Sequence, residues 1–334
     1  MAIATSPDAV SLAAIEAARA RIAGRVRRTE TTASAALTQR IGYPVILKCE
    51  HRQLTGSFKL RGATNALLSL TPEVRRRGVV TVSTGNHGRA LAHAAAAEGV
   101  RCVVCLSTLV PANKIAAIRA AGAEPHVGGA SQDDAQQAAD KLVAEQHLVL
   151  IPPFDDPDVI AGQGTLGLEI VEDVPDLELV VVPLSGGGLA AGVAAAVKGL
   201  RPRVRVVGVS MERGAAMHVS LLAGRPVPVE EVPTLADALG GGIGIDNRYT
   251  FAMVRGLLDD VVLLTEAEIA AAIRHAHAVE GETLEGAGAV AIGALLAGKV
   301  APRGPSVAIL SGGNIDPGLH RRILAGADTV EERA

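Results

Sequence analysis

A lysine in a Ser/Gly-rich run is the first residue with a clear chemical use. Lys59 lies in the segment Gln53–Ala63 and is one of only six lysines in 334 residues. A lysine amine forms a Schiff base with an aldehyde where its positive charge is suppressed. Phe58, directly before it, is one of three phenylalanines in a chain with two tyrosines and no tryptophan. A scarce ring beside a scarce amine favours a flat aldehyde cofactor, although an exposed helix lysine beside a core phenylalanine explains this run equally well.

A run of three glycines offers a site for an anion. Gly186–Gly188 follow Ser185 and the apolar stretch Leu179–Pro183, and they open the Ala-rich stretch Leu189–Lys198. Consecutive glycines let backbone N–H groups converge on one anion, and a helix N-terminus adds a positive potential there. The pattern favours a phosphate over a turn that binds nothing. It is not the Walker pattern, because no Lys-Ser/Thr pair follows.

Three further turns carry polar side chains at the ends of apolar runs. Ser83–Gly88 groups hydroxyl and amide donors that suit a carboxylate, although an ordinary helix N-cap explains this segment as well. Ser311, in Leu310–Asn314, is placed to offer a neutral hydroxyl to a ring nitrogen. Glu285 opens another helical stretch, where a carboxylate is favourable in itself. In a parallel α/β sheet such turns meet at the carboxyl ends of the strands, where ligands collect.

The elements that must position these residues alternate along the chain. Short β-branched apolar runs alternate with Ala-rich helical stretches, which predicts an α/β fold with largely parallel sheets covered on both faces. The predicted strands are 45–47, 79–82, 102–106, 179–183, 204–209, 261–264 and 306–310. The predicted helices are 11–23, 87–98, 112–121, 131–146, 189–198 and 266–279. The stretches 151–163 and 214–248 show no clear period and are expected to be irregular, with Gly240–Gly244 shaping a pocket wall.

Composition limits the partners and the compartment. The net charge of −3 gives no indication of nucleic acid or an anionic membrane as a partner. Neither a signal peptide nor a run of about 18 uncharged apolar residues appears, so a cytoplasmic protein is expected. The odd cysteine count, three, fits a reducing compartment. Cys102 and Cys105 are expected to be buried strand residues, because no second pair completes a zinc site.

Together these segments resemble one family. The chain is similar over nearly its whole length to fold-type II pyridoxal-phosphate enzymes of the serine/threonine dehydratase group. The resemblance implies two three-layer αβα domains with mostly parallel sheets, as in the tryptophan synthase β chain. Residues 1–53 and 147–334 would form a large cofactor-binding domain, and residues 54–146 a small mobile domain. The resemblance lies in Ser57–Ala63, Ser83–His87, Phe154–Asp156 with Ile160–Thr165, Ser185–Leu189 and Ser311–Asn314.

The resemblance also implies a role for each motif residue. Lys59 would hold pyridoxal 5'-phosphate as a Schiff base and remove the α-proton of the substrate, and Thr84 would place a hydroxyl on the opposite face of the ring. The implied cofactor contacts are Phe58, Lys59, Asn86, Ser185, Gly186, Gly187, Gly188, Leu189, Glu285 and Ser311. The implied substrate contacts are Ser83, Gly85, Asn86 and His87. No metal is expected, because Ser210 and Ala216 stand where some relatives carry acidic ligands.

The implied activity is that of an ammonia-lyase. Such an enzyme dehydrates and deaminates a small β-hydroxy amino acid, such as L-threonine or L-serine, to a 2-oxo acid and ammonia, and a homodimer is expected. The substrates 3-hydroxyaspartate and hydroxyectoine-derived compounds stay open, since Thr234–Arg248 resembles the hydroxyectoine-utilisation dehydratase branch. β-Replacement is an alternative reaction, and a non-catalytic ligand-binding regulator is an alternative of another class.

Overall fold

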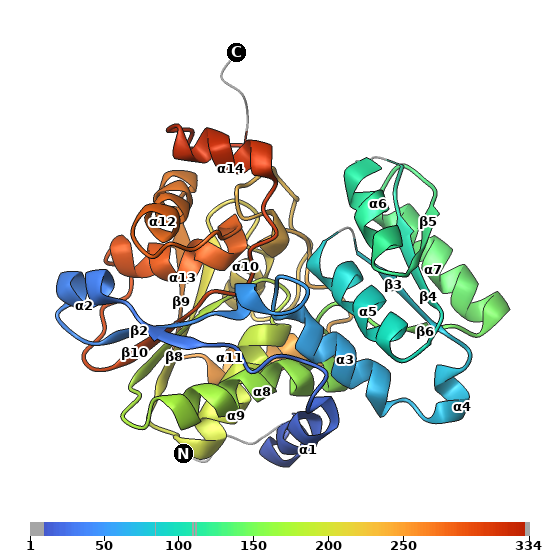
Figure 1. Ribbon diagram of the computed structural model, residues 1–334, viewed down its shortest axis with the longest axis horizontal. Helices are drawn as coiled ribbons and strands as arrows, with labels where there is room; N and C mark the ends of the chain where they lie inside the picture. The colour runs from blue at the N-terminus through green and yellow to red at the C-terminus, as the bar shows by residue number, and fades with distance from the viewer. Residues whose placement is uncertain (1–9, 84, 109, 111, 331–334) are drawn as a thin grey trace.

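The protein contains two β-sheets. The structure is a computed structural model that describes residues 10–83, 85–108, 110 and 112–330. The strands are β1 (Thr31–Ala33), β2 (Val45–Lys48), β3 (Val79–Val82), β4 (Cys102–Leu106), β5 (Glu124–Val127), β6 (Val149–Leu150), β7 (Leu179–Pro183), β8 (Arg205–Met211), β9 (Asp260–Leu264) and β10 (Ser306–Ile309). The larger sheet has the order β1-β2-β10-β7-β8-β9, and the smaller β5-β4-β3-β6. Among the described strands every pairing is parallel except that of β1 with β2. The two sheets lie on opposite sides of the molecule (Figure 1).

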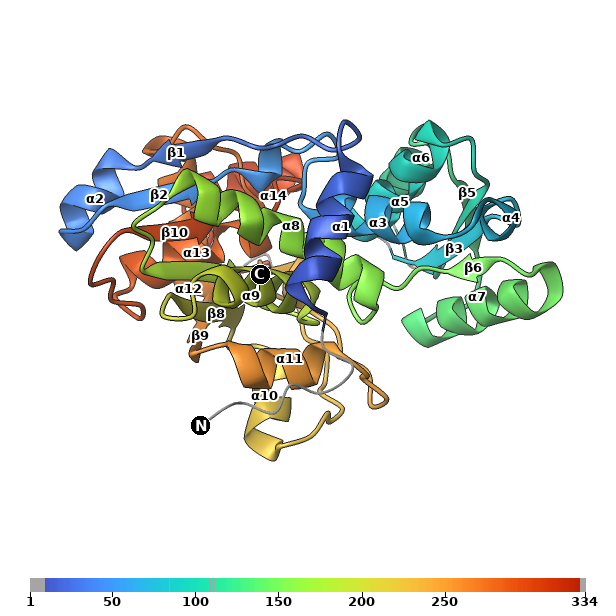
Figure 2. The ribbon, with the colours of Figure 1, turned by 90° about the horizontal axis from the view of Figure 1, so that it is seen from below.

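Helices pack on both faces of each sheet. They are α1 (Leu12–Ile22), α2 (Ala35–Ile41), α3 (Lys59–Ser69), α4 (Pro72–Arg75), α5 (Asn86–Ala97), α6 (Ala112–Ala120), α7 (Gln132–Gln146), α8 (Pro157–Asp173), α9 (Gly188–Leu200), α10 (Ala216–Ala223), α11 (Thr250–Leu257), α12 (Glu266–Ala278), α13 (Gly286–Leu296) and α14 (Pro317–Leu324), with short 3-10 turns at Glu50–Arg52 and Asp237–Leu239. One core of the large sheet joins α1, α8, α9, α10 and α11, and the other joins α2, α12, α13 and α14. On the small sheet α3, α5 and α6 share one core and α7 covers the opposite face (Figure 2).

The predicted α/β fold is confirmed, because each predicted strand and helix has its counterpart. The strands β3, β4, β7 and β10 are buried at every position, as expected for parallel strands covered on both faces. The sequence pattern did not reveal β1, β5 and β6. They are two to four residues long and partly exposed; β1 and β5 carry no apolar run, and β6 has only two residues.

The prediction of an irregular stretch over 151–163 was wrong for its second half. Helix α8 begins at Pro157, and the Asp156 carboxylate accepts hydrogen bonds of 2.9 Å from the N–H groups of Asp158 and Val159. An N-cap aspartate followed by proline is a standard helix start. Three glycines in the first turns masked this signal. In the second irregular stretch, the structure likewise contains α10.

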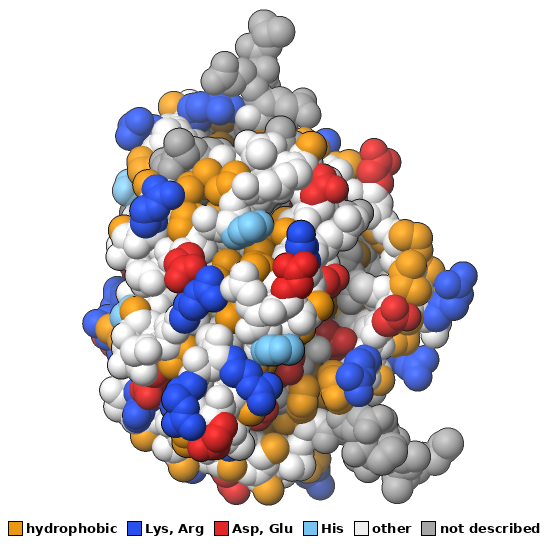
Figure 3. Space-filling model, turned by 90° about the vertical axis from the view of Figure 1, so that its right-hand side faces the viewer, with side chains coloured by type: hydrophobic (Ala, Val, Ile, Leu, Met, Phe, Trp, Pro, Cys, Tyr) orange, Lys and Arg blue, Asp and Glu red, His pale blue; other side chains and the backbone are white. Residues whose placement is uncertain are grey.

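Three structural observations bear on the other expectations. The three cysteines are free and buried, and burial raises the pKa of Cys102 to about 12. No helix in the described part of the chain combines the length and the hydrophobicity that a membrane span requires. On the face of the molecule formed by the small-sheet side, Lys and Arg side chains are mixed with Asp and Glu side chains (Figure 3). The division at residues 54 and 146 stays a prediction, and β6 of the small sheet lies just past its second boundary.

Candidate functional site

A cavity of about 490 Å³ lies between the two sheets, where β3, β7 and β10 end. Its volume is typical of a site for a small organic ligand. The predicted site residues that the structure describes all line it: Phe58, Lys59, Ser83, Gly85, Asn86, His87, Ser185, Gly186, Gly187, Gly188, Leu189, Glu285 and Ser311. Thr84, the second predicted catalytic residue, lies outside the described residues.

Lys59 is the first residue of α3, and its amine faces the cavity. Its Nζ donates a 2.6 Å hydrogen bond to the carbonyl oxygen of Pro153 and lies 5.2 Å from the centroid of the Phe58 ring. Burial lowers the pKa of Lys59 to about 8, although the nearby Glu285 acts in the opposite direction. A substantial fraction of the amine is therefore neutral at mildly alkaline pH and able to attack a carbonyl.

A close crossing of α3 and α8 fixes the position of Lys59. A Cβ atom on Gly162 of α8 would lie 2.7 Å from both the Arg61 oxygen and the Gly62 Cα, so the two backbones touch at this point. A Cβ on Gly62 would lie 2.8 Å from the Val159 oxygen. Glycine is required on both helices, because any side chain would push α3 away from α8.

A buried ion cluster holds the same turn of α3. The Arg61 guanidinium makes two 2.8 Å hydrogen bonds to Glu50 and two of 2.7 and 2.9 Å to Glu169. Lys48 Nζ lies 2.9 Å from the Glu169 carboxylate. All four side chains are buried and each charge is paired, so removing one partner leaves an unpaired buried charge. The cluster ties α3 to α8 and to the end of β2.

The glycine run forms a cradle at the start of α9. Gly187 has a φ of +92°, which an L side chain rarely adopts, and a Cβ on Gly186 would lie 2.4 Å from a ring carbon of Phe154. Within the described chain, the backbone N–H groups of Gly186–Leu189 have no intramolecular acceptor. Several free N–H groups at a helix N-terminus bind an anion. The cradle therefore fits a phosphate group.

Asn86 and Glu285 contact each other in the cavity wall. Asn86 Nδ2 donates a 2.6 Å hydrogen bond to Glu285 Oε1. Burial, followed by the charge of Asp237, raises the pKa of Glu285 to about 7. The carboxyl group is therefore close to half protonated at neutral pH and is able to hold a proton inside the cavity.

His87 presents an acceptor and not a donor. Its Nε2 lies 3.0 Å from the Ile151 carbonyl oxygen, which only accepts hydrogen bonds, so Nε2 carries the proton. Burial lowers the pKa of His87 to about 3, so the ring is neutral and Nδ1 carries no proton. The imidazole ring of this tautomer has no N–H left for a substrate carboxylate.

Several cavity residues were missed by the reasoning from sequence. Asn314 was recognised as part of a motif but not as a site residue. Arg89 was also missed, although it directly follows the Ser83–Gly88 motif. The expected pocket wall at Gly240–Gly244 is confirmed for Gly240, Gly241 and Gly242, and the missed Asp237 of the same stretch also lines the cavity. The other missed residues are Val82, Pro153, Phe154, Pro183, Glu231, Ala238, Leu239 and Ala287.

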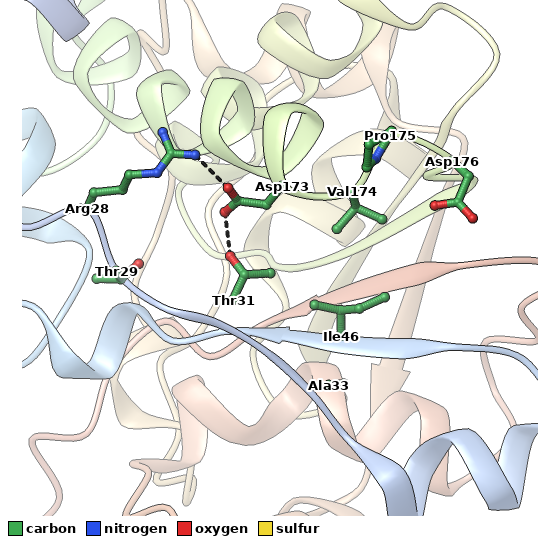
Figure 4. A pocket seen from close by; sticks show the side chains of 9 residues that line it. All are labelled: Arg28, Thr29, Thr31, Ala33, Ile46, Asp173, Val174, Pro175 and Asp176. Carbon is green, nitrogen blue, oxygen red and sulfur yellow. Dashed lines mark hydrogen bonds and ion pairs between the residues drawn. The ribbon is translucent and has the colours of Figure 1, made fainter.

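A second hollow, of about 620 Å³, lies between β1, β2 and the end of α8 (Figure 4). Two of its three charged side chains are paired with each other, because Asp173 accepts 2.5 Å hydrogen bonds from Arg28 and from Thr31. None of the predicted site residues lines it. It therefore offers no comparable chemistry.

The cavity between the sheets fits pyridoxal phosphate. Lys59 supplies an amine of lowered pKa, the glycine cradle supplies N–H donors for the phosphate, and Ser311 supplies a neutral hydroxyl, now 3.3 Å from the Ala287 oxygen. The described residues contain no group of three or more His, Cys, Asp or Glu side chains that is placed to hold a metal ion.

Comparisons with known proteins agree with this geometry. A family model described as "Pyridoxal-phosphate dependent enzyme" matches residues 22–312. A protein of Sinorhizobium fredii named "Putative threonine dehydratase" is 61% identical over 97% of this chain and 98% of its own. An L-threonine ammonia-lyase of Thermotoga maritima is 42% identical over 94% of this chain and 78% of its own. The structure of maize serine racemase superposes with a TM-score of 0.89 at 32% identity, covering 95% of this chain and 97% of that one. The chain therefore belongs to the pyridoxal-phosphate dependent enzymes, and within them to the fold-type II serine/threonine dehydratase group.

Proposed function

We propose that the chain is an ammonia-lyase that converts L-threonine and L-serine to the corresponding 2-oxo acid and ammonia. The observation that carries the proposal is Lys59, a lysine of lowered pKa in the same cavity as an anion cradle. The names of the relatives support this choice, since two of them are called a threonine dehydratase and an L-threonine ammonia-lyase. Water leaves during elimination and returns during hydrolysis, so L-threonine gives 2-oxobutanoate and ammonia in net balance.

The reaction needs both the cofactor and a base. Pyridoxal phosphate, when bound, supplies the electron sink for the negative charge that develops at the substrate Cα. In this proposal Lys59 removes the α-proton, because its amine is partly neutral at mildly alkaline pH and the Pro153 oxygen orients it at 2.6 Å. Glu285, whose raised pKa lies near 7, holds a proton inside the same space.

Positioning falls to the three turns around the cavity. The N–H groups of Gly186–Leu189 hold the phosphate, and Phe58 lies beside the ring. Asn86 donates to the ring oxygen, and Ser311 offers its hydroxyl to the ring nitrogen. Ser83 and the start of α5, with Gly85 leaving open space, hold the substrate carboxylate. Thr84 stays a predicted acid on the opposite face.

A second candidate substrate is a hydroxyectoine-derived compound. It is favoured by the cavity wall, since Glu231 and Asp237 line the cavity and have no ion-pair partner among the described residues. Carboxylates at this wall favour a substrate that carries a second positive charge. They disfavour 3-hydroxyaspartate, whose second carboxylate would face them.

The assembly and location are part of the proposal. A cytoplasmic homodimer with a mobile small domain agrees with the resemblance to the dehydratase group, and three free cysteines suit a reducing compartment. Light scattering on the purified protein measures the mass directly. A stable monomer would contradict the proposed dimer and leave the chemistry untouched.

Product analysis tests the proposed activity. The purified protein with pyridoxal phosphate is incubated with L-threonine, L-serine, 3-hydroxyaspartate and the ring-opened diamino acid derived from hydroxyectoine, and ammonia and 2-oxo acid are measured with and without added sulfide. We expect both products from L-threonine and L-serine and no incorporation of sulfide. The Lys59→Ala variant should lose at least about 10³-fold in rate. Lys141→Ala, which removes an exposed lysine of α7, should keep full activity. Absence of ammonia, or full activity of Lys59→Ala, would contradict the proposal.

A further inference from the structure

We propose that Asn314 is a positioning residue that fixes the side-chain amide of Asn86 with its NH₂ group directed at Glu285 and the cavity. Asn86 is the proposed donor to the ring oxygen of the cofactor, so the functional consequence of this inference rests on the proposed function. The geometric part concerns only side chains of this chain, and it is tested separately below.

The amide of Asn314 has one possible orientation. Its Nδ2 donates a 3.0 Å hydrogen bond to the Thr55 carbonyl oxygen, which only accepts. Its Oδ1 accepts a 3.1 Å hydrogen bond from Nη1 of Arg89, a guanidinium that only donates. These two partners have opposite and unchangeable roles, so exchanging the oxygen and nitrogen of Asn314 would oppose both.

The space for this arrangement depends on Gly56. This residue has a φ of +77°, and a Cβ atom built on it would lie 2.5 Å from Asn314 Oδ1. A side chain at this position would displace the amide oxygen from Arg89. The backbone also helps, because the Gly313 N–H donates a 2.9 Å hydrogen bond to the Gly56 oxygen.

The fixed amide of Asn314 determines the orientation of its neighbour. Through its second hydrogen, Asn314 Nδ2 donates a hydrogen bond to Asn86 Oδ1, with 2.6 Å between nitrogen and oxygen. The oxygen of Asn86 is therefore engaged on this side, and its Nδ2 must lie on the other side, where it donates to Glu285 at 2.6 Å. A flipped Asn86 would direct its NH₂ group at the NH₂ group of Asn314, and two partly buried donors would face each other without an acceptor.

The chain of hydrogen bonds crosses between the two sheets. Asn86 and Arg89 come from α5, which packs on the small sheet, whereas Asn314 follows β10 of the large sheet. Besides Arg89 and Glu285, the charged residues that line the cavity in the described part of the chain are Lys59, Glu231 and Asp237. The consequence is a donor of fixed direction at the place where the proposed function puts the ring oxygen.

The Asn314→Asp and Asn314→Ala variants separate positioning from a structural role. Asp keeps the shape and an acceptor for Arg89 but opposes Asn86 Oδ1 with a second oxygen, so the Asn86 amide should turn over. Ala removes the constraint without imposing the wrong orientation. We expect the dissociation constant for pyridoxal phosphate, measured by fluorescence, to rise about tenfold for Asp and about threefold for Ala, about the effect of one lost hydrogen bond.

A purely structural role predicts the reverse order, because Asp is the closer match in shape. The same pair of substitutions is then made in an Asn86→Ala background, where the difference between Asp and Ala should disappear. Asp316→Asn, an exposed N-cap two residues away, changes the charge by one unit and should leave the dissociation constant unchanged. The inference would be overturned if the Asn314→Asp variant bound pyridoxal phosphate as tightly as Asn314→Ala. It would also be overturned if the difference between the two variants persisted in the Asn86→Ala background.

A second measurement, by NMR, requires no cofactor and does not depend on the folding of the Asn314→Asp variant. The chain contains only five asparagines, so selective ¹⁵N-asparagine labelling gives few side-chain NH₂ signals in an NMR spectrum. Asn86→Ala identifies the signals of Asn86. In Asn314→Ala the Asn86 amide keeps Glu285 as an acceptor but is free to turn over, so we expect its signals to move part of the way toward those of an amide without a hydrogen bond, and unchanged Asn86 signals would refute the positioning role. Absence of any adduct on Lys59 in the wild-type protein would instead refute the proposed function.

Discussion

At the scale of single residues, the chemistry of this chain comes from where ordinary side chains are buried. Lys59, His87 and Glu285 each have a pKa far from the usual range, and burial is the largest cause in all three. Burial disfavours the charged form, so it lowers the pKa of a lysine or histidine and raises that of a glutamate. The result is a neutral imidazole, a carboxyl group that holds a proton, and an amine that can lose one.

The lowered pKa of Lys59 predicts how the apoprotein captures pyridoxal phosphate. Only the unprotonated amine attacks the aldehyde, so the capture rate should rise with pH and reach half its plateau at about 8. Stopped-flow absorbance at a series of pH values gives this curve. A midpoint near 10.5, the value of an exposed lysine, would contradict the burial argument.

Residue type alone revealed only part of this site. Lys59 and Gly186–Gly188 were found because their residue types are scarce or repeated next to an apolar strand. Arg61 and Glu169 were not found, because their pairing joins positions 108 residues apart and no local pattern indicates a partner at that distance. Asn314 was part of a motif, but its role depends on Arg89, which only the fold brings near.

At the scale of helices and strands, the crossing of α3 and α8 determines where the amine stands. Gly62 and Gly162 allow the two backbones to touch, and Arg61 locks the first turn of α3 through its ion pairs with Glu50 and Glu169. Neither helix was predicted from the sequence: α3 coincides with no predicted element, and the first turns of α8 were expected to be irregular. Glycines within a helix weaken the usual periodic signal, and here they are needed for packing.

The Gly162→Ala substitution tests the importance of this crossing. The new methyl group would lie 2.7 Å from backbone atoms of Arg61 and Gly62, so we expect a loss of about 1–3 kcal/mol in the free energy of unfolding. The displaced α3 should also weaken cofactor binding. Urea unfolding and a cofactor titration measure the two effects.

Gly199→Ala is the matched control for this substitution. Gly199 is an exposed helical glycine whose added Cβ would meet only Leu12, at 3.4 Å. We expect a gain of about 0.5–1 kcal/mol there, as for alanine over glycine in a helix. A Gly162→Ala protein as stable as this control would show that the crossing tolerates a side chain.

At the scale of the whole molecule, the site exists only because two sheets face one cavity. The amine and α5 lie on the side of the small sheet, whereas the anion cradle and Ser311 follow strands of the large sheet. The parallel topology was predictable from the sequence, because buried β-branched runs and Ala-rich helices alternate. How the two sheets face each other was not, since it depends on contacts such as those of Arg61 and Asn314.

Cofactor binding should therefore stabilise both halves of the chain together. A ligand at 100 times its dissociation constant adds about 2.7 kcal/mol to the free energy of unfolding. We expect hydrogen exchange, followed by mass spectrometry, to slow on cofactor addition in both α5 and the first turn of α9. Protection confined to α9 would mean that the small sheet takes no part in holding the cofactor.

The most direct test of the whole account is the site of covalent attachment. The protein is loaded with pyridoxal phosphate, reduced with borohydride and digested, and the peptides are weighed. The account predicts one phosphopyridoxyl adduct, on the peptide that contains Lys59, and none on the peptides of the other five lysines. An adduct on another lysine, or none at all, would contradict it.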